Sequence, residues 1–175
     1  MSRPLAAGVL GFVIVGVAAC GSPGSSGSEL EQGGSSEVAS PSSSSAEPVD
    51  PCQAVASGDA AQLGVEGSGE AENLSSSRTC TWKISTGGVF SVTADDKYSV
   101  DELNLSNGRV EEASLGGMAT KIIRESVGPG DCAVVFDSSP SSSIQIDVVV
   151  PRDTEAACQL AQKATPLVAK NLVND

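Results

Sequence analysis

The sequence predicts an α+β domain over residues 50–175, in which N- and C-terminal helices cover one face of an antiparallel sheet of about five strands. Three observations lead to this prediction. Helical spacing occurs near both ends of this region, apolar and polar residues alternate through its middle, and four cysteines lie within it, enough for two disulfides.

Residues 1–19 have the pattern of a lipoprotein signal peptide, with Arg3 followed by an uncharged apolar run over residues 5–18. The run is shorter than the roughly twenty residues that a membrane-spanning helix needs. Val17-Ala18-Ala19-Cys20 resembles the bacterial lipobox. The resemblance implies cleavage before Cys20 and attachment of a diacylglyceryl group, with acyl chains such as palmitate, to its thiol. The alternative is an ordinary secretory signal with a chance cysteine.

Residues 20–49 carry this cysteine and a tether. Residues 21–49 contain 11 Ser, 5 Gly, 3 Pro and 4 Glu, without Lys or Arg. Such a composition offers little apolar surface and favours disorder. We expect a spacer between the cell membrane and the domain, with its glycosylation left open.

The composition excludes several classes of function. The net charge is −12, which argues against nucleic acid as a partner. The chain contains no histidine, so Ser-His and Cys-His nucleophile pairs and His-containing zinc sites are excluded. Only five aromatic residues are present, so aliphatic side chains and Ala must fill most of the core.

The predicted elements begin at Asp50-Pro51, an N-cap followed by Pro at the first helical position. A helix in two turns is expected to end at Gly64, and residues 66–77 are expected to form a loop. Apolar alternation then predicts four strands and a short helix. The strands cover about residues 79–84, 90–94, 119–125 and 132–136, and the short helix covers 98–105.

The strand over residues 144–150 has the cleanest alternation, and Pro151 ends it. Asp153 is expected to cap a final helix whose apolar residues recur with helical spacing. Pro166 lies inside that helix and is expected to kink or break it.

The four cysteines of the domain predict two disulfides, because an exported chain meets an oxidising environment. Cys80 and Cys132 each begin an inward-facing set on a strand, whereas Cys52 and Cys158 lie on the two helices of the other layer. We therefore expect the pairs Cys52–Cys158 and Cys80–Cys132. A four-cysteine zinc site is the alternative, and the sequence lacks the Cys-x-x-Cys pair typical of one.

The sequence also resembles a known family, the actinobacterial lipoproteins with domain of unknown function 3558 (DUF 3558). The residues that carry the resemblance are Asp50-Pro51-Cys52, Leu63-Gly64, Cys80-Thr81-Trp82, Gly116-Gly117, Cys132 and Cys158-Gln159-Leu160-Ala161. At residues 56–59 the sequence departs from the helix start usual in that family. The resemblance implies a surface lipoprotein and assigns no catalytic residue.

Two groups of residues are candidates for a site. Asp95, Asp96 and Tyr98 form a candidate binding rim. Asp95 and Asp96 together with Asp101 and Glu102 form an acidic cluster, but it lacks the spacing and the glycine of a calcium loop.

We expect a non-catalytic binding or interaction module, held on the extracytoplasmic face of the cell membrane through Cys20. Its partner would be an envelope protein or a small ligand, with no cofactor and no metal. The alternatives are an envelope hydrolase that uses a carboxylate pair and a structural lipoprotein without a discrete ligand.

Overall fold

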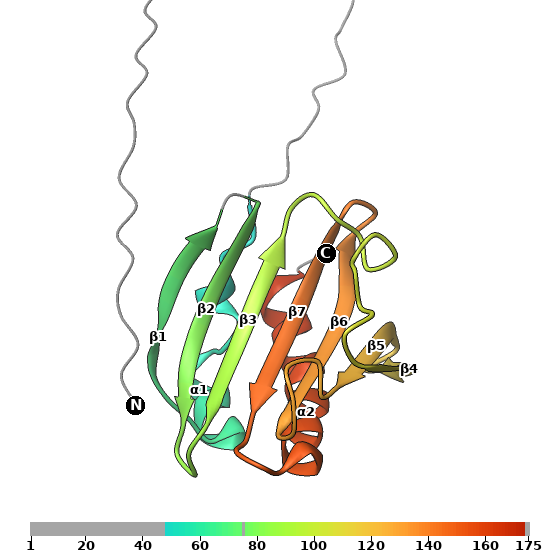
Figure 1. Cartoon of the computed structure of the whole chain (residues 1–175). Coiled ribbons are helices and arrows are strands. Elements are labelled where there is room, and N and C mark those ends of the chain that lie inside the picture. The colour runs from blue at the N-terminus through green and yellow to red at the C-terminus, as the bar shows by residue number, and fades with distance from the viewer. Residues whose placement is uncertain (1–47, 75, 174–175) are drawn as a thin grey trace, which may run out of the picture. The chain divides into compact units, whose positions relative to one another are not determined.

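A computed structural model describes residues 48–74 and 76–173 (Figure 1). Seven strands form one antiparallel sheet in the order β1-β2-β3-β7-β6-β5-β4. They are β1 Val65–Leu74, β2 Ser77–Ile84, β3 Val89–Asp95, β4 Arg109–Leu115, β5 Met118–Arg124, β6 Asp131–Ser139 and β7 Ser142–Val149. The helices are the 3-10 turn η1 Pro51–Gln53, α1 Ser57–Leu63 and α2 Thr154–Leu172, all on the same face of the sheet. The α+β class with helices on one face is confirmed, with seven strands in place of about five.

The N-terminal helical segment begins at the capping residue Asp50. The Asp50 carboxylate accepts a hydrogen bond from the Cys52 backbone N–H at 3.0 Å. The chain then leaves η1 and starts α1, which ends at Gly64 with φ +66°. Glycine adopts this left-handed conformation without the steric cost that other residues have.

Helix α2 supplies most of the helical layer that covers the inward face of the sheet. The Asp153 carboxylate caps it by accepting from the Ala156 N–H at 2.9 Å. Its buried face consists mostly of small side chains, which let the helix lie close to the sheet: Ala157, Cys158, Ala161, Ala164, Thr165, Val168 and Ala169. The helix continues through the exposed Pro166 to Leu172, so the expected break at this proline is absent.

The core lies between these helices and the inward face of the sheet. Phe90, Val92, Val134, Ile144, Ile146 and Val148 are fully buried there. The rings of Trp82 and Phe90 meet edge to face, with centroids 5.7 Å apart. The alternation seen in the sequence thus identified the inward face of β2, β3, β6 and β7.

The connection over residues 96–108 is a long loop, and the short helix expected over 98–105 does not form. Ser99 and Glu102 nevertheless make a contact of the capping-box kind, because the Ser99 N–H and hydroxyl donate to Glu102 Oε2 at 2.9 and 2.8 Å. Val100, Leu103 and Leu105 of the loop instead pack on Ile123, Ala133 and Val135 of the opposite sheet face. Burial of these apolar groups determines the path of the loop.

The two strands that the sequence did not predict are the edge strands β1 and β4. Only Val65 is buried in β1, and no residue of β4 is buried. Each edge strand is bound to its neighbour by a backbone ladder, which is regular in β4 and interrupted by one bulge in β1. Because backbone hydrogen bonds need no particular side chain, these strands have no apolar alternation to read.

The disulfides are Cys52–Cys80 and Cys132–Cys158, with Cα atoms 5.0 Å apart in each, so the predicted pairing is wrong. Cys80 and Cys132 do share the inward face, but β3 and β7 separate their strands. Three strand spacings amount to about 14 Å, well beyond the reach of a disulfide. Each disulfide therefore ties one helical segment to the strand beneath it.

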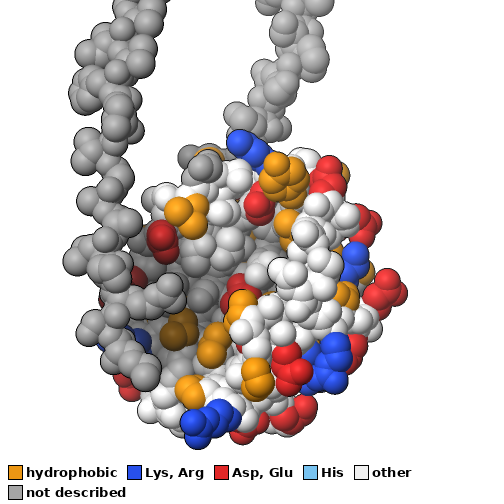
Figure 2. Space-filling view, viewed as in Figure 1, with side chains coloured by type: hydrophobic (Ala, Val, Ile, Leu, Met, Phe, Trp, Pro, Cys, Tyr) orange, Lys and Arg blue, Asp and Glu red, His pale blue; other side chains and the backbone are white. Residues whose placement is uncertain are grey.

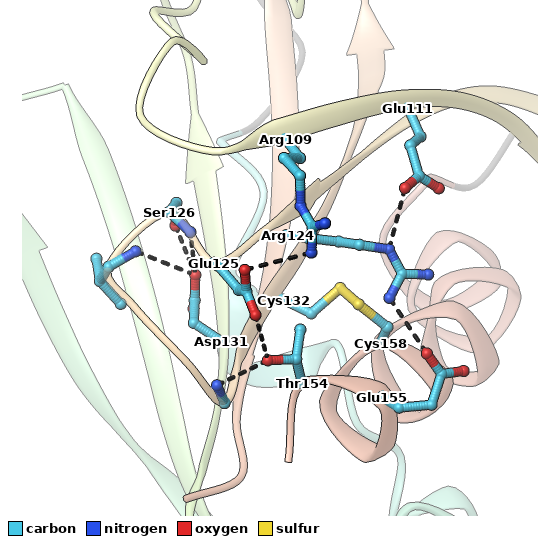
Figure 3. A network of polar contacts seen from close by, with 12 residues as sticks. Arg109, Glu111, Arg124, Glu125, Ser126, Asp131, Cys132, Thr154, Glu155 and Cys158 are labelled. Carbon is cyan, nitrogen blue, oxygen red and sulfur yellow. Dashed lines mark hydrogen bonds and ion pairs between the residues drawn. A yellow bond between two sulfur atoms is a disulfide. The ribbon is translucent and has the colours of Figure 1, made fainter. Parts of the chain in front are cut away.

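A polar network beside Cys132–Cys158 holds the start of α2 (Figure 3). Arg124 donates to Glu111 on β4 at 3.2 Å and to Glu155 on α2 at 3.3 Å. The Thr154 hydroxyl donates to Glu125 at 3.1 Å and accepts from the Gly130 N–H at 2.9 Å. The network joins the strands β4–β6 and the first turn of α2 into one unit.

We predict that the double substitution Cys132→Ala and Cys158→Ala lowers the free energy of unfolding by about 3 to 4 kcal/mol, because the disulfide closes a loop across 26 positions. Urea denaturation measures the loss. Peptide mapping without reduction tests the pairing, and a peptide that links Cys80 to Cys132 would contradict it.

Candidate binding face

The sheet face opposite the helices carries a row of small polar side chains over β2, β3 and β7. They are among the residues out of phase with the core, because alternate side chains point to opposite faces. We call them the polar floor, which consists of Thr79, Thr81, Ser91, Thr93, Gln145 and Asp147, all half-buried. Figure 2 shows that this face is hollowed over β2 and β3, whereas the bulk of the loop over residues 96–108 rises beside it.

The strand register places these side chains in lines across the sheet. Thr81 lies opposite Ser91, and Ser91 lies opposite Asp147. On the other side of Thr81, Glu70 of β1 continues the same line. Glu70 and Asp147 thus end a line of two hydroxyl side chains, with about 14 Å between their backbones.

Asp147 of β7 is the carboxylate of the polar floor. The Gln145 Nε2 donates to its two oxygens at 2.8 and 3.0 Å. Burial raises the pKa of Asp147 to about 6, Gln145 opposes this rise, and the nearby charge of Asp131 adds to it. No cation contacts Asp147 within the described part of the chain.

A bulge in β1 opens a cavity of about 420 Å³ at one end of the floor. The ladder is interrupted between Glu66 and Glu70, where Gly67 and Gly69 both have φ +79°. The cavity is lined by this bulge together with Thr81, Trp82, Lys83 and Val89. A Cβ on Gly69 would lie 2.5 Å from Cys80 Sγ, so the bulge runs directly against the disulfide.

The loop forms the opposite wall of the floor. A second cavity of about 180 Å³ lies between Asn104, Leu105 and Asn107 of the loop and the side chains of Ala133 and Gln145 on the sheet. The amide of Gln145 therefore connects this cavity to Asp147. The floor is bounded by a glycine bulge on one side and a packed loop on the other.

The comparison with protein-family models identifies the family to which this chain belongs. Residues 15–171 match the model of the family described as "Protein of unknown function (DUF3558)". The chain belongs to the DUF3558 family. Neither the curated proteins nor the solved structures contain a match to it.

In this DUF3558 protein the predicted rim residues lie at and just after the end of β3, and they line neither of the two cavities. Asp95 Oδ1 accepts from the N–H groups of Lys97 and Tyr98 at 2.9 and 3.1 Å. Asp96 pairs with Arg78 at 2.5 Å, and Tyr98 is 47% exposed. The structure brings the three together, but its own turn and ion pair occupy both carboxylates. Cys20 lies outside the described residues.

The remaining acids of the predicted cluster are also engaged. Asp101 pairs with Lys121 at 2.7 Å, which lowers the pKa of Asp101, and the hydrogen bonds from Ser99 lower the pKa of Glu102. Within residues 48–74 and 76–173, three or more His, Cys, Asp or Glu side chains nowhere gather as metal ligands. No helix of the same residues is long and apolar enough to span the membrane.

One feature of the sequence indicates the polar floor of this DUF3558 protein, although the predicted rim residues lie elsewhere. Solvent-facing positions of a strand usually include long charged side chains, yet these carry mainly Ser and Thr, with Gln and one Asp. Asp147 stands between Ile146 and Val148, in the cleanest strand of the chain. The run of short polar residues across several strands was the available indication of a recessed face.

We predict that Gly69→Ala destabilises the fold more than Gly67→Ala does. Both glycines have φ +79°, so both variants carry a backbone strain of about 1 kcal/mol. A Cβ at Gly67 meets no atom within 4 Å, whereas a Cβ at Gly69 overlaps Cys80 and Trp82, adding about 1 to 3 kcal/mol. Urea midpoints measure the difference, and equal midpoints would show that the bulge does not press on the disulfide.

We predict that Asp147→Asn stabilises the fold above pH 6. Since the folded-state pKa of about 6 lies above the ordinary value, ionisation of Asp147 destabilises the folded state as the pH rises from about 4 to 6. Because the side chain is only partly buried, solvent screening reduces the effect, so we expect a gain of about 1 kcal/mol at pH 7.5 and none at pH 4.

Urea denaturation at both pH values measures this gain. Glu112→Gln is the control, because Glu112 is exposed on the far edge strand β4. A gain from Asp147→Asn that is the same at both pH values would contradict the assigned pKa.

Proposed function

We propose that the chain is a lipid-anchored lipoprotein of the cell surface that acts as a non-catalytic binding module, with its open sheet face as the binding surface. The hollow over the polar floor is the observation that carries the binding role. It combines the cavity of about 420 Å³ at the β1 bulge with hydrogen-bonding groups turned toward solvent. Recessed surfaces with a few convergent polar groups are typical of ligand sites.

The expected membrane attachment and the two disulfides support the same proposal. The signal pattern and the lipobox-like Val17-Ala18-Ala19-Cys20 support an anchor at Cys20, ahead of a long Ser/Gly/Pro tether. Two acyl chains hold a protein on a membrane much more firmly than one. The two disulfides suit an oxidising compartment outside the cytoplasm.

The interactions of the acidic groups favour binding over hydrolysis by a carboxylate pair. Asp131 is buried, and its Oδ2 accepts from the Ser126 hydroxyl and N–H at 2.6 and 2.9 Å, which holds the turn before β6. Asp147, on the open sheet face, has a neutral amide as its hydrogen-bonding neighbour. This arrangement supports recognition of a ligand by Asp147.

For the anchor, we predict that Cys20→Ala abolishes metabolic labelling with a palmitate analogue and moves the protein out of the washed membrane fraction. Cys20→Ser is a second variant that keeps a polar side chain of similar size but lacks the thiol. Unchanged membrane retention of both variants would contradict anchoring through Cys20.

For binding, we predict that a photo-crosslinking amino acid at Val89 forms adducts in intact cells. Val89 lines the cavity and is 39% exposed, so a probe there is expected to leave the core intact. Gln62, exposed on α1 behind the sheet, is the matched control position. Adducts at Val89 that do not exceed those at Gln62 would count against the open face as the binding surface.

A further inference from the structure

The open face has an excess of acidic side chains with no cationic partner among the described residues. Glu66, Glu70 and Glu72 of β1 are exposed and lie opposite Lys83, Thr81 and Thr79, on the same face as the floor. Asp147 lies three strands away from them. Lys83 is the one cation along the cavity, and the other lysine of this face, Lys121, pairs with Asp101.

Resting on the binding role proposed above, we propose that this face binds a linear amine with at least two cationic nitrogens, one at Asp147 and the other at Glu70. The chain of the ligand would lie across β2 and β3, along the line Glu70, Thr81, Ser91 and Asp147 that the register defines. The chemical class is a polyamine or another linear diammonium compound.

The environment of Asp147 supports an ammonium at this end. Its neighbours on the face are the neutral Gln145 and Ser91 and the acidic Asp131, so no positive charge of the described chain offsets its burial. A charge-assisted hydrogen bond from an ammonium group is stronger than one from a neutral amide. Binding of a cation would therefore supply the interaction that this half-buried carboxylate lacks.

The floor between the two carboxylates supports an extended amine. Thr81 and Ser91 contribute hydroxyl oxygens, which accept hydrogen bonds from N–H groups along a polyamine. The polar floor has no aromatic ring on which a sugar would stack, and Trp82, which lines the adjoining cavity, is only 2% exposed. The acids lie at opposite ends of a line about 14 Å long, a spacing that fits two separate cations better than one metal ion.

The protein's own tether does not match this face. Residues 21–49 contain four Glu and no Lys or Arg, so the tether offers no ammonium group for Asp147 or Glu70. Its charge has the same sign as the face. The electrostatics therefore favour an external cationic ligand over the tether.

Isothermal titration of the full mature chain in neutral-detergent micelles tests the proposal, at pH 7.5 and 0.15 M salt. The probes are spermine, putrescine and butylamine. We expect saturable binding of spermine at one site, weaker binding of the shorter putrescine and the weakest binding of butylamine, which has a single nitrogen. Equal affinity for all three probes, or no binding of spermine at millimolar concentration, would overturn the proposal.

Charge-matched variants locate the site. Asp147→Asn and Glu70→Gln should each lower the affinity for spermine about tenfold, the scale of one lost charge-assisted contact. Glu112→Gln removes the same charge from β4, also on the open face but beyond the loop, and should leave the affinity within about twofold. Equal losses in all three variants would show non-specific attraction to an acidic protein and overturn the site.

The spermine titration tests the ligand class, whereas the crosslinking at Val89 tests the open face as a binding surface, so the two experiments can fail independently. Adducts at Val89 without spermine binding would refute the amine as the ligand class and leave the open face as a binding surface. Absence of adducts together with site-specific spermine binding would keep the amine site and refute an abundant partner in the cell.

Discussion

The contact between α2 and the sheet is the interaction on which the rest of this structure depends. A single antiparallel sheet has two faces, and the small side chains of α2 bury one of them against β6 and β7. Few aromatic residues are present, so close approach of the helix replaces bulk in the core. Cys132–Cys158 and Arg124 attach the first turns of α2, and Cys52–Cys80 attaches η1 at the other end of the layer.

The helices bury only one face of the sheet. Side chains on the other face of β2 and β3 are therefore not needed to fill the core. The loop over residues 96–108 covers only the part of that face above β5 and β6, through Val100, Leu103 and Leu105. What is left between the loop and β1 is a recess with a polar floor. The raised pKa of Asp147 reflects a carboxylate held in that recess without a cation.

The bulge in β1 links the stability of the domain to the shape of this recess. Gly69 lies against Cys80 and Trp82, so the same disulfide that fixes η1 also limits how far the bulge can move inward. The edge strand is thereby held away from β2 at the cavity. A site built in this way takes its rigidity from the core and its polarity from residues that the core does not use.

Secondary structure with a buried face followed from the sequence. The alternation in β2, β3, β6 and β7, the caps at Asp50 and Asp153, the turn at Gly64 and the presence of two disulfides were all predicted, because local side-chain patterns encode them. The edge strands, the disulfide pairing and the place of β7 beside β3 depend on strand order, which arises from contacts between distant segments. For the same reason the sequence could list Thr81, Ser91 and Asp147 as polar positions, but only the register across three strands brought them into one line.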